Sequence, residues 1–455
     1  MFYLWMVLLA LLSMGTDVKP EVNVCPICLA DFHGHEVPPV VVKTQCGHHF
    51  HLDCISRQFV SQPVGSRQCA ICRQDPMPVV NLSTGESHPD AFFPNETFCD
   101  ACYYGDLDQV EKSLAEGVNV NAFTHNDFTA LMIASYRGHK AIVECLINAG
   151  ANLNATSETG TTALFLSAQE NHSDCVKLLI NAGADINARA KDGASPLFIA
   201  AQENHIDSVK LLINAGANLN TVWLVDGATP LFMAAQKNNI DCLKLLINAG
   251  ADLNIPCEDG TTPLFIAAQR GNIDCLKLLI NAGADINARA KDGASPLFIA
   301  AQENHIDCVK LLINAGADIN AVWIEEGVTP LFMAAQENHT DCLKLLINAG
   351  ADLNARRTED GATPLFIAAR EDNTDCVELL INAGADLNAR RTKDGATPLF
   401  IAAREGNIEC LKRLIRAEAD ISAVLSDGTT LLSIAIGMGN ADCARLLMNA
   451  GAERE

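Results

Sequence analysis

A segment of 33 or 34 residues recurs along most of this chain. It is marked by the strings ASPLF, ATPLF, TTPLF and VTPLF, whose prolines stand at 196, 230, 263, 296, 330, 364 and 398, and the register extends to Ala130, Ala163 and Leu431. A unit of this length cannot bury its own apolar faces, so neighbouring units must stack and share one elongated core. The repeat therefore predicts a solenoid rather than one globular domain.

Each unit is expected to contain two short helices. Thr229 can cap the first helix and Pro230 pre-sets its first φ angle, after which the run LFMAAQKN places small alanines where the next repeat must approach. The run IDCLKLLINAG predicts a second helix with apolar residues mostly inward, and Gly250 ends it in the left-handed conformation that glycine tolerates. The following ADLN turns into a hairpin finger, so the fingers and first helices should form a concave surface.

The pattern DGxTPLFIAAQENHxDCxKLLINAGADLNA resembles the ankyrin repeat, and the resemblance covers residues 95–455 with about 11 units. It implies a mainly α fold, an ankyrin solenoid whose surface binds a protein substrate. The family normally has histidine after the leucine of its TPL motif. Here phenylalanine stands there, which we expect to exchange polar contacts for apolar packing without changing the fold; the positions are Phe198, Phe232, Phe265, Phe298, Phe332, Phe366 and Phe400.

Metal-binding residue types stand near the N-terminus in four close pairs. The pairs are Cys25 and Cys28, Cys46 and His48, His51 and Cys54, and Cys69 and Cys72. A structural zinc ion takes four thiolate or imidazole ligands, and each short pair can supply two of them, so four pairs make two closed sites. A segment this small cannot bury a useful core, and metal binding is expected to supply its folding energy.

The strings VCPIC, QCGHHFHLDC and QCAICR resemble the RING finger, in the variant whose fourth and fifth ligands are both histidine. The resemblance implies a two-zinc cross-brace domain over residues 22–76. One zinc ion would then be held by Cys25, Cys28, His51 and Cys54, and the other by Cys46, His48, Cys69 and Cys72. His49 is left without a ligand role. The alternative is a zinc module that only folds and docks to a neighbour.

Further residues match positions that RING ubiquitin ligases use to hold a ubiquitin-conjugating enzyme. The resemblance implies that Ile27 makes a hydrophobic contact to that enzyme. It also implies that Arg73 bridges the enzyme and its thioester-linked ubiquitin, a task that suits an always charged, planar guanidinium. No covalent intermediate on the ligase is expected, because catalysis would be positional.

Two residues depart from the family pattern on this face. Ala70 stands where the family usually has proline, and Gln58 stands where a tryptophan usually packs against the conjugating enzyme. Phe59 and Ile55 are the nearest apolar substitutes that the sequence offers. We expect these changes to weaken or redirect binding of the conjugating enzyme without affecting the zinc sites.

Charge and cysteine usage restrict the environment and the partners. The formal charge of −23 and the pI near 4.8 argue against nucleic-acid binding, which needs surplus Lys and Arg. One repeat position holds Ile142 or Ser208 in two units and cysteine in eight others, which predicts buried packing thiols there. Those thiols are Cys175, Cys242, Cys275, Cys308, Cys342, Cys376, Cys410 and Cys443. Together with a zinc finger they indicate a reducing compartment.

Several finger residues are candidates for partner binding. Residues 181–217 recur at 281–317 with few changes, and two lengthened fingers, TVWLVDG and AVWIEEG, follow the two copies. An exposed indole in each would anchor a partner, whereas a ring folded over the neighbouring finger would not. Adjacent arginines in two other fingers either grip an acidic segment or form a solvated charged loop. The candidates are Trp223, Trp323, Arg356, Arg357, Arg390 and Arg391.

Two segments lie outside the modules. Residues 77–94 are rich in Pro, Ser and Asn and are interpreted as a linker that lets the zinc finger swing. Residues 1–15 are apolar, too short for an ordinary spanning helix and without a basic start. Three interpretations remain for them: a functional signal-like segment, a membrane-surface anchor through residues 1–14, or a misassigned start.

The sequence as a whole favours a ubiquitin ligase. Its ankyrin array would select a protein substrate, and its RING finger would recruit a ubiquitin-conjugating enzyme charged with ubiquitin. The alternative is a non-enzymatic ankyrin scaffold or adaptor with a structural zinc finger. Metal-dependent hydrolysis is disfavoured because all eight ligands are used in closed sites. We expect a cytoplasmic location, or else association with a membrane or secretion as an effector that acts in a host cytoplasm.

Overall fold

The computed structural model describes residues 25–28, 40–62, 66–124 and 127–451, and the chain divides into two compact units. Unit 1 comprises Met1–Glu158 and Asn181–Ala184, and unit 2 comprises Thr159–Ile180 and Asp185–Glu455. The apolar segment 1–15 lies outside the described residues. Among the residues that are described, no helix combines the length and apolar character needed to cross a membrane.

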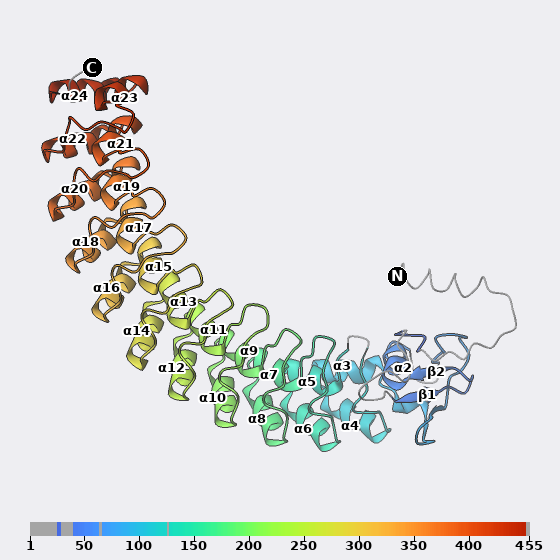
Figure 1. The fold of residues 1–455 in the computed structure, drawn as a ribbon. Coiled ribbons are helices and arrows are strands. Elements are labelled where there is room, and N and C mark those ends of the chain that lie inside the picture. Colours follow the sequence, from blue (N-terminus) through green and yellow to red (C-terminus); the bar gives the residue numbers. More distant parts are fainter. Residues whose placement is uncertain (1–24, 29–39, 63–65, 125–126, 452–455) are drawn as a thin grey trace, which may run out of the picture. The chain divides into compact units, whose positions relative to one another are not determined.

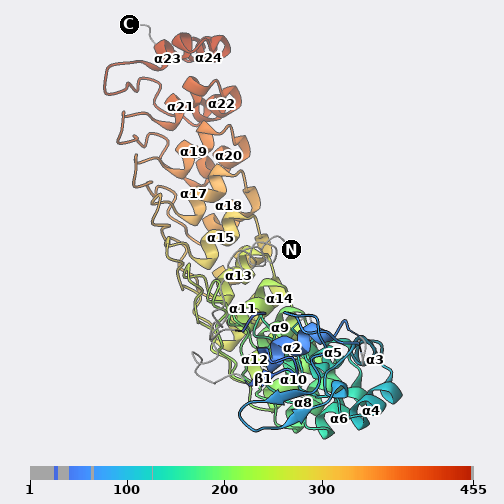
Figure 2. The same cartoon turned by 90° about the vertical axis from the view of Figure 1, so that its right-hand side faces the viewer.

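Unit 2 is a row of stacked helix pairs joined by hairpin fingers (Figure 1). The first helices of the pairs contact one another along the row, and so do the second helices, while the fingers project from one side (Figure 2). The mainly α, ankyrin-type array expected from the repeat is thus confirmed. Its helices are α7 (Ala163–Gln169), α8 (Ser173–Asn181), α9 (Pro196–Gln202), α10 (Ile206–Asn214), α11 (Pro230–Gln236), α12 (Ile240–Asn248), α13 (Pro263–Gln269), α14 (Ile273–Ala282), α15 (Pro296–Gln302), α16 (Ile306–Asn314), α17 (Pro330–Gln336), α18 (Thr340–Asn348), α19 (Pro364–Arg370), α20 (Thr374–Ala383), α21 (Pro398–Glu405), α22 (Ile408–Arg416), α23 (Leu431–Gly437) and α24 (Ala441–Asn449).

The first helix of each pair begins as the sequence predicts. In α11, the Thr229 hydroxyl accepts a hydrogen bond from the backbone N–H of Phe232 at 3.2 Å, and Pro230 occupies the first turn. The cap satisfies a donor that the helix itself cannot pair, and proline loses nothing there because its missing N–H would be unpaired anyway. Leu231 and Phe232 are then buried against the neighbouring pairs.

Side chains at the start of each second helix join neighbouring repeats. The Asn373 amide donates to the backbone carbonyls of Ala335 and Gln336, 2.9 and 2.7 Å away, at the end of the first helix of the preceding repeat. These carbonyls belong to a helix C-terminus, where no intrahelical partner exists. At the same repeat position the His339 ring nitrogen lies 3.0 Å from the carbonyl oxygen of Ala301. The junction between repeats is therefore polar at its edge and apolar at its centre.

The repeated cysteines are buried, as expected. Their side chains are at most 1% exposed, and burial raises the pKa of Cys242 to about 11, so the thiol stays neutral at physiological pH. The Cys242 thiol also donates to the side-chain oxygen of Asn204 in the preceding repeat, at 3.4 Å. Ser208, which replaces cysteine in one unit, makes the same contact to Asn171 at 3.5 Å. The position thus combines packing with one weak bond between repeats.

Unit 1 contains a small antiparallel sheet in the order β2-β1-β3-β4, one short helix against it, and the first two helix pairs of the array. Val42 of β1 lies opposite Phe50 of β2 and Asn81 of β3, so β1 is paired on both edges. The elements are β1 (Val41–Lys43), β2 (His49–His51), α2 (Leu52–Phe59), β3 (Val79–Asn81), β4 (Ser87–His88), the 3-10 turn η1 (Asp90–Phe92), α3 (Glu96–Tyr104), α4 (Leu107–Ala115), α5 (Ala130–Arg137) and α6 (Lys140–Asn148).

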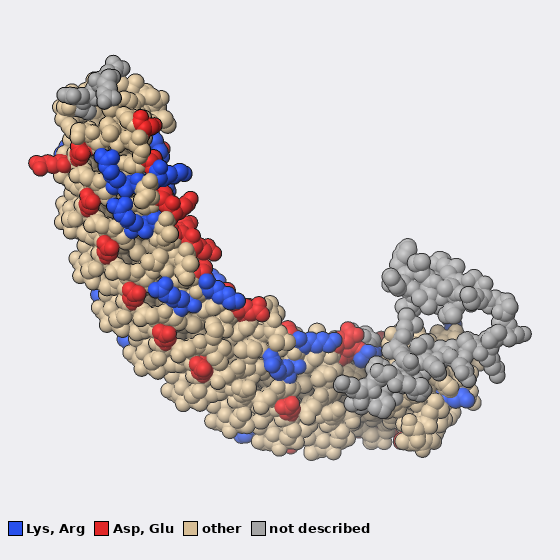
Figure 3. Space-filling view, viewed as in Figure 1, with Lys and Arg blue, Asp and Glu red and all other residues tan. Residues whose placement is uncertain are grey.

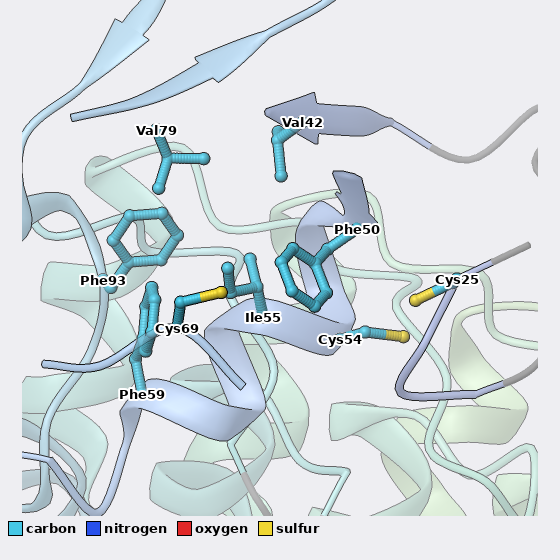
Figure 4. Packing of buried hydrophobic residues seen from close by; sticks show 9 residues of the cluster. All are labelled: Cys25, Val42, Phe50, Cys54, Ile55, Phe59, Cys69, Val79 and Phe93. Atoms are coloured by element: carbon cyan, nitrogen blue, oxygen red, sulfur yellow. The ribbon is translucent and has the colours of Figure 1, made fainter. Parts of the chain in front are cut away.

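Residues 77–94, which we interpreted as a linker, are part of this folded unit instead. They supply β3 and β4, and Val79 and Phe93 are fully buried in the same core as Phe50, Ile55 and Phe59 (Figure 4). The Phe59 and Phe93 rings meet edge to face with centroids 5.1 Å apart. Strands of two or three residues are too short to show a periodic pattern, which is why composition alone suggested a linker.

Arg67 fastens this segment to α2. Its side chain is fully buried, and its guanidinium donates to the carbonyls of Asp90, Phe93 and Pro94 at 2.6, 2.9 and 3.0 Å. The same group lies 3.1 Å from the Asp90 carboxylate and over the Phe59 ring. A planar fork with five donors can serve several carbonyls at once, which a single ammonium group cannot. The segment just before α3 is therefore held against the end of α2.

A second contact joins α2 to the first finger of the array. The Nε atom of Arg57, on α2, lies 2.7 Å from the Asp127 carboxylate, in an ion pair whose N–H is not directed at the oxygen. The Arg57 guanidinium also covers the Phe123 ring at 5.1 Å. Half-exposed pairs of this kind contribute about 0–1 kcal/mol, so the buried Arg67 bonds are the stronger attachment.

Replacing Asn373 tests the polar edge of the repeat junction. Asn373→Ala leaves two carbonyls without donors and should lower the free energy of unfolding by about 1–3 kcal/mol. Asn373→His should recover most of the loss, because histidine occupies this position in sister repeats. Urea unfolding followed by circular dichroism measures both variants. An equal loss of unfolding free energy in the two variants would contradict the role of this side chain in pairing the carbonyls.

Replacing Arg67 tests the attachment of residues 90–94. Arg67→Ala should increase amide hydrogen exchange in β3, β4 and the start of α3 about tenfold or more, because several charge-assisted hydrogen bonds disappear together. Arg67→Lys should recover little of the protection. The exposed neighbour Gln68, replaced by alanine, serves as the control and should leave exchange unchanged. If residues 77–94 were a free linker, Arg67→Ala would also leave their hydrogen exchange unchanged.

Candidate metal centres and partner-binding surfaces

The first donor cluster gathers Cys25, Cys28, His51 and Cys54. The cysteines of the turn 25–28 meet the last residue of β2 and the first turn of α2, and all four ligand atoms lie within 4.8 Å of one another. His51 Nδ1 is 3.4 Å from the Cys28 sulfur and 4.0 Å from the Cys54 sulfur. The junction between β2 and α2 thus positions two of the four donors, His51 and Cys54.

The second donor cluster gathers Cys46, His48, Cys69 and Cys72. Cys46 and His48 lie in the turn between β1 and β2, and the other two stand in the turn that follows residue 68. His48 Nδ1 is 3.5 Å from the Cys46 sulfur and 3.6 Å from the Cys69 sulfur. The Thr44 hydroxyl lies 3.1 Å from the Cys46 sulfur and so supports a donor from outside the cluster. His49 is exposed and belongs to neither cluster.

Both clusters fit a four-coordinate metal ion. A tetrahedral ion bonded to sulfur at about 2.3 Å and to nitrogen at about 2.0 Å holds those two atoms about 3.5 Å apart, close to the separations here. Three thiols and one imidazole are also the donor types of closed structural sites. The two groups of four match the pairing that the RING resemblance implies.

The electrostatics of the first cluster favour a bound cation. A hydrogen bond from Cys54 is the main cause that lowers the pKa of Cys25 to about 4, and the same contact raises the pKa of Cys54. One proton is thus retained between neighbouring sulfurs, because adjacent thiolates repel each other. A dication among the donors removes that repulsion and allows all of the thiols to ionise.

The face that would meet a conjugating enzyme is open. Ile27 is 36% exposed in the first cysteine turn, and Arg73 is exposed directly after the last donor, with a left-handed backbone φ of 60°. Ile71, which we did not single out from the sequence, is 48% exposed in the second cysteine turn. The sequence could have identified it, because Ile71 in CAIC stands at the same position as Ile27 in CPIC.

Phe59 and Ile55 do not replace the missing tryptophan, which corrects our expectation. Both side chains are fully buried in the core of unit 1 and cannot reach a partner. Gln58 itself is exposed on the same helix, and Ala70 is also exposed. A helix of eight residues turns neighbouring positions to different faces, so apolar neighbours of Gln58 point inward. The open face is therefore polar where the family usually has its aromatic contact.

Trp223 and Trp323 fold back over the array rather than project from it. Each ring packs against the phenylalanine of the preceding first helix, Phe198 at 5.7 Å and Phe298 at 5.4 Å between centroids. Their indole N–H groups are buried and have no acceptor among the described residues, so packing alone holds the rings. Each ring is thus folded back, as in the second of the two arrangements that we considered, but onto a phenylalanine of a first helix.

The paired arginines divide into two kinds. Arg357 lies over the Phe332 ring at 5.7 Å and pairs with Asp360, and its equivalent Arg391 lies over Phe366 at 5.0 Å and pairs with Asp394. The phenylalanines that replace the family histidine therefore form a platform for the next finger. The other two arginines are more open and bond to the backbone of the following finger: Arg356 to Arg390, and Arg390 to Val424.

Comparison with known protein families agrees with this geometry. The family model described as ankyrin repeats (3 copies) matches residues 98–190, 187–257, 250–323, 322–391 and 389–454. The model described as Ring finger domain matches residues 23–73. No curated protein matches the chain significantly.

Among solved structures, similarity is found to the crystal structure of the human ASB11 ankyrin repeat domain. The two share 26% sequence identity with a TM-score of 0.45, and the match covers 50% of this chain and 100% of the other. The family matches extend over most of the described residues of both units. The chain therefore belongs to the ankyrin-repeat family and carries a RING finger at its N-terminal end.

Proposed function

We propose that this protein is a RING-type ubiquitin ligase. The observation that carries the proposal is the pair of four-donor clusters with Ile27 and Arg73 exposed beside them. In this proposal the metal is zinc, which holds the cysteine turns in place and supplies no chemistry to the transfer. Ile27 and Ile71 contact a ubiquitin-conjugating enzyme, and Arg73 restrains the ubiquitin that the enzyme carries as a thioester.

The chemical step takes place on the conjugating enzyme. A substrate lysine attacks the thioester carbonyl, an amide bond to ubiquitin forms, and the enzyme's cysteine leaves as a thiol. The ligase contributes by restricting the thioester to a reactive pose and by holding a protein substrate on the repeats. Because Arg67 fastens the zinc finger to the segment before α3, the enzyme-binding face has a fixed orientation relative to the first repeats of unit 1.

A specific observation favours a second candidate, a non-enzymatic adaptor. The exposed Gln58 and Ala70 remove the apolar contacts that family ligases place on this face. An adaptor would keep both zinc ions and the repeats yet bind no conjugating enzyme. For either candidate we propose a cytoplasmic location, because the zinc thiols and the buried repeat thiols require a reducing compartment.

Metal analysis tests the zinc assignment. Native mass spectrometry should find two zinc ions in the wild type and one in the Cys25→Ser, Cys28→Ser variant, because the clusters share no donor. Chelation should increase hydrogen exchange in β1, β2 and α2, since metal binding supplies their folding energy. Helices α9 to α24 contain no cluster residue and serve as the internal control. A metal-free protein with unchanged protection in β1 and α2 would contradict the assignment.

Substitution of Arg73 tests the ligase proposal. The measurement is the rate at which the charged conjugating enzyme transfers its ubiquitin to free lysine. Arg73→Asn should slow discharge about ten- to hundredfold, the equivalent of one or two charge-assisted hydrogen bonds. Asparagine is chosen because it tolerates the left-handed backbone, so the turn is preserved. Arg73→Ala should slow discharge as much, and an unchanged rate in both variants would favour the adaptor.

Gln58→Trp provides the complementary gain of function. Restoring an aromatic side chain at this exposed position should strengthen binding of the conjugating enzyme about tenfold, because buried aromatic residues dominate interface energies. Titration of the enzyme by isothermal calorimetry measures the change. Ser83→Trp, in the exposed turn between β3 and β4, is the control and should change binding little. Equal affinities for wild type and Gln58→Trp would show that this face is not the docking face.

A further inference from the structure

One backbone hydrogen bond defines an equivalent tip residue in seven fingers of unit 2. In each finger the N–H of this residue donates to a carbonyl of the preceding finger, as from Leu224 to Asp192 at 2.7 Å and from Ile324 to Asp292 at 2.9 Å. The tip residue is polar in five fingers: Lys191, Glu258, Lys291, Thr392 and Ser426. It is apolar only in the two fingers that also carry tryptophan, so these two tips form a distinct set.

The two apolar tips are exposed yet held firmly. Leu224 is 60% exposed and Ile324 is 68% exposed, although burial would stabilise either side chain. Each lies against a glycine of the preceding finger, so close that a Cβ on Gly193 or Gly293 would come within 2.5 or 2.3 Å of it. Their fingers are further fixed by the tryptophan that packs beneath. Side chains that are already ordered lose little entropy when a partner covers them.

A cavity lies beside the second tip. It has a volume of about 620 Å³ and is lined by Ile324 together with the apolar side chains of Phe298, Ile299 and Trp323. Asp259, Asp292 and Glu325 also line it, against the single cation Lys291. An apolar side chain of a partner can enter this space next to Ile324, and a basic residue beside it would meet a surplus of carboxylates.

Charge on the inner edge of unit 2 indicates the chemistry of the partner. Acidic and basic side chains gather along this edge, where the fingers lie (Figure 3). Beside Ile324 the acidic side chains predominate, since Glu325 and Glu326 follow it and two aspartates line the adjacent cavity, against Lys291 and Arg289. Beside Leu224 the charges balance, because the Arg189 guanidinium bonds to the Val222 carbonyl there and offsets Asp226. The whole chain carries a formal charge of −23, which attracts basic partners and disfavours acidic ones.

The spacing of the tips restricts the partner further. They are 100 residues apart, which is three repeats. Helices stack at about 8–10 Å, so three repeats span roughly 24–30 Å. An extended chain rises about 3.3 Å per residue and would cover this span in about seven to nine residues.

We propose that Leu224, Ile324 and the cavity beside Ile324 form one docking surface for an extended protein segment. The segment carries two apolar side chains about seven to nine residues apart, with Lys or Arg next to the one that enters the cavity. One side chain contacts Leu224, and the other enters the cavity against Ile324 and Trp323. The inference rests on the proposed function only in calling the bound protein a substrate, because binding itself requires no ligase activity.

Synthetic peptides test the surface directly. The panel carries two leucines separated by three to fifteen residues of Gly, Ser and Lys, with lysines outside them, and the full-length zinc-loaded protein is titrated by fluorescence anisotropy. Affinity should be highest at a separation of seven to nine residues and should fall as salt rises. Leu224→Asp and Ile324→Asp should each weaken binding at least tenfold, and the double variant should lose it.

Matched controls separate the tips from a general charge effect. Thr392→Asp and Ser426→Asp add the same charge at equivalent tips and should leave affinity within about twofold. All variants should retain the wild-type melting temperature, because tip side chains are exposed. Absence of binding across the panel, equal binding by the double variant, or an equal loss in the controls would overturn the proposal. So would self-association of the wild type that the double variant abolishes, since the surface would then bind a second copy.

The ligase assay distinguishes this failure from failure of the proposed function. If the peptide binds but ubiquitin is not discharged, the docking surface is supported and the ligase proposal is contradicted. If discharge depends on Arg73 but no peptide binds, the ligase proposal is supported and the docking surface is contradicted.

Discussion

The structure depends on burial of apolar faces between neighbouring repeats. A single helix pair contributes Leu231, Phe232 and Cys242 to an interior that it cannot close alone, and the adjacent pairs complete it. The same junctions are sealed at their edges by side chains such as Asn373, which pair carbonyls that a helix end leaves free. Stability is therefore a property of adjacent repeats, and function must be carried by residues that stacking does not use.

The RING finger is stabilised in a different way. Its core is a small cluster around Phe50, Ile55 and Phe59, and two groups of donors hold the turns that surround it. Arg67 joins the part that carries the donor clusters to the segment before α3, where burial between repeats begins. Loss of metal should thus affect the zinc finger and the adjoining strands, whereas the helices of unit 2 are independent of it. This arrangement lets one chain combine a RING finger with a repeat array.

Residue patterns predicted most of the fold because its signals are local. The cap at Thr229 and the cysteine pairs each lie within a few residues of the structure that they form. The features that the sequence left open or misjudged depend on distant contacts instead. Whether Trp223 is exposed depends on Phe198, one repeat earlier, and whether Ile55 can reach a partner depends on which face of α2 packs on the sheet. Residues 77–94 form strands too short for any periodic signal.

The most direct test of the central claim is an autoubiquitination assay with a panel of conjugating enzymes. Zinc-loaded wild type should produce ubiquitin ladders with at least one enzyme, and the Cys25→Ser, Cys28→Ser variant should produce none while its repeats remain folded. If the wild type yields no ladder with any enzyme while both zinc ions are bound, the account of this protein as a ubiquitin ligase is contradicted.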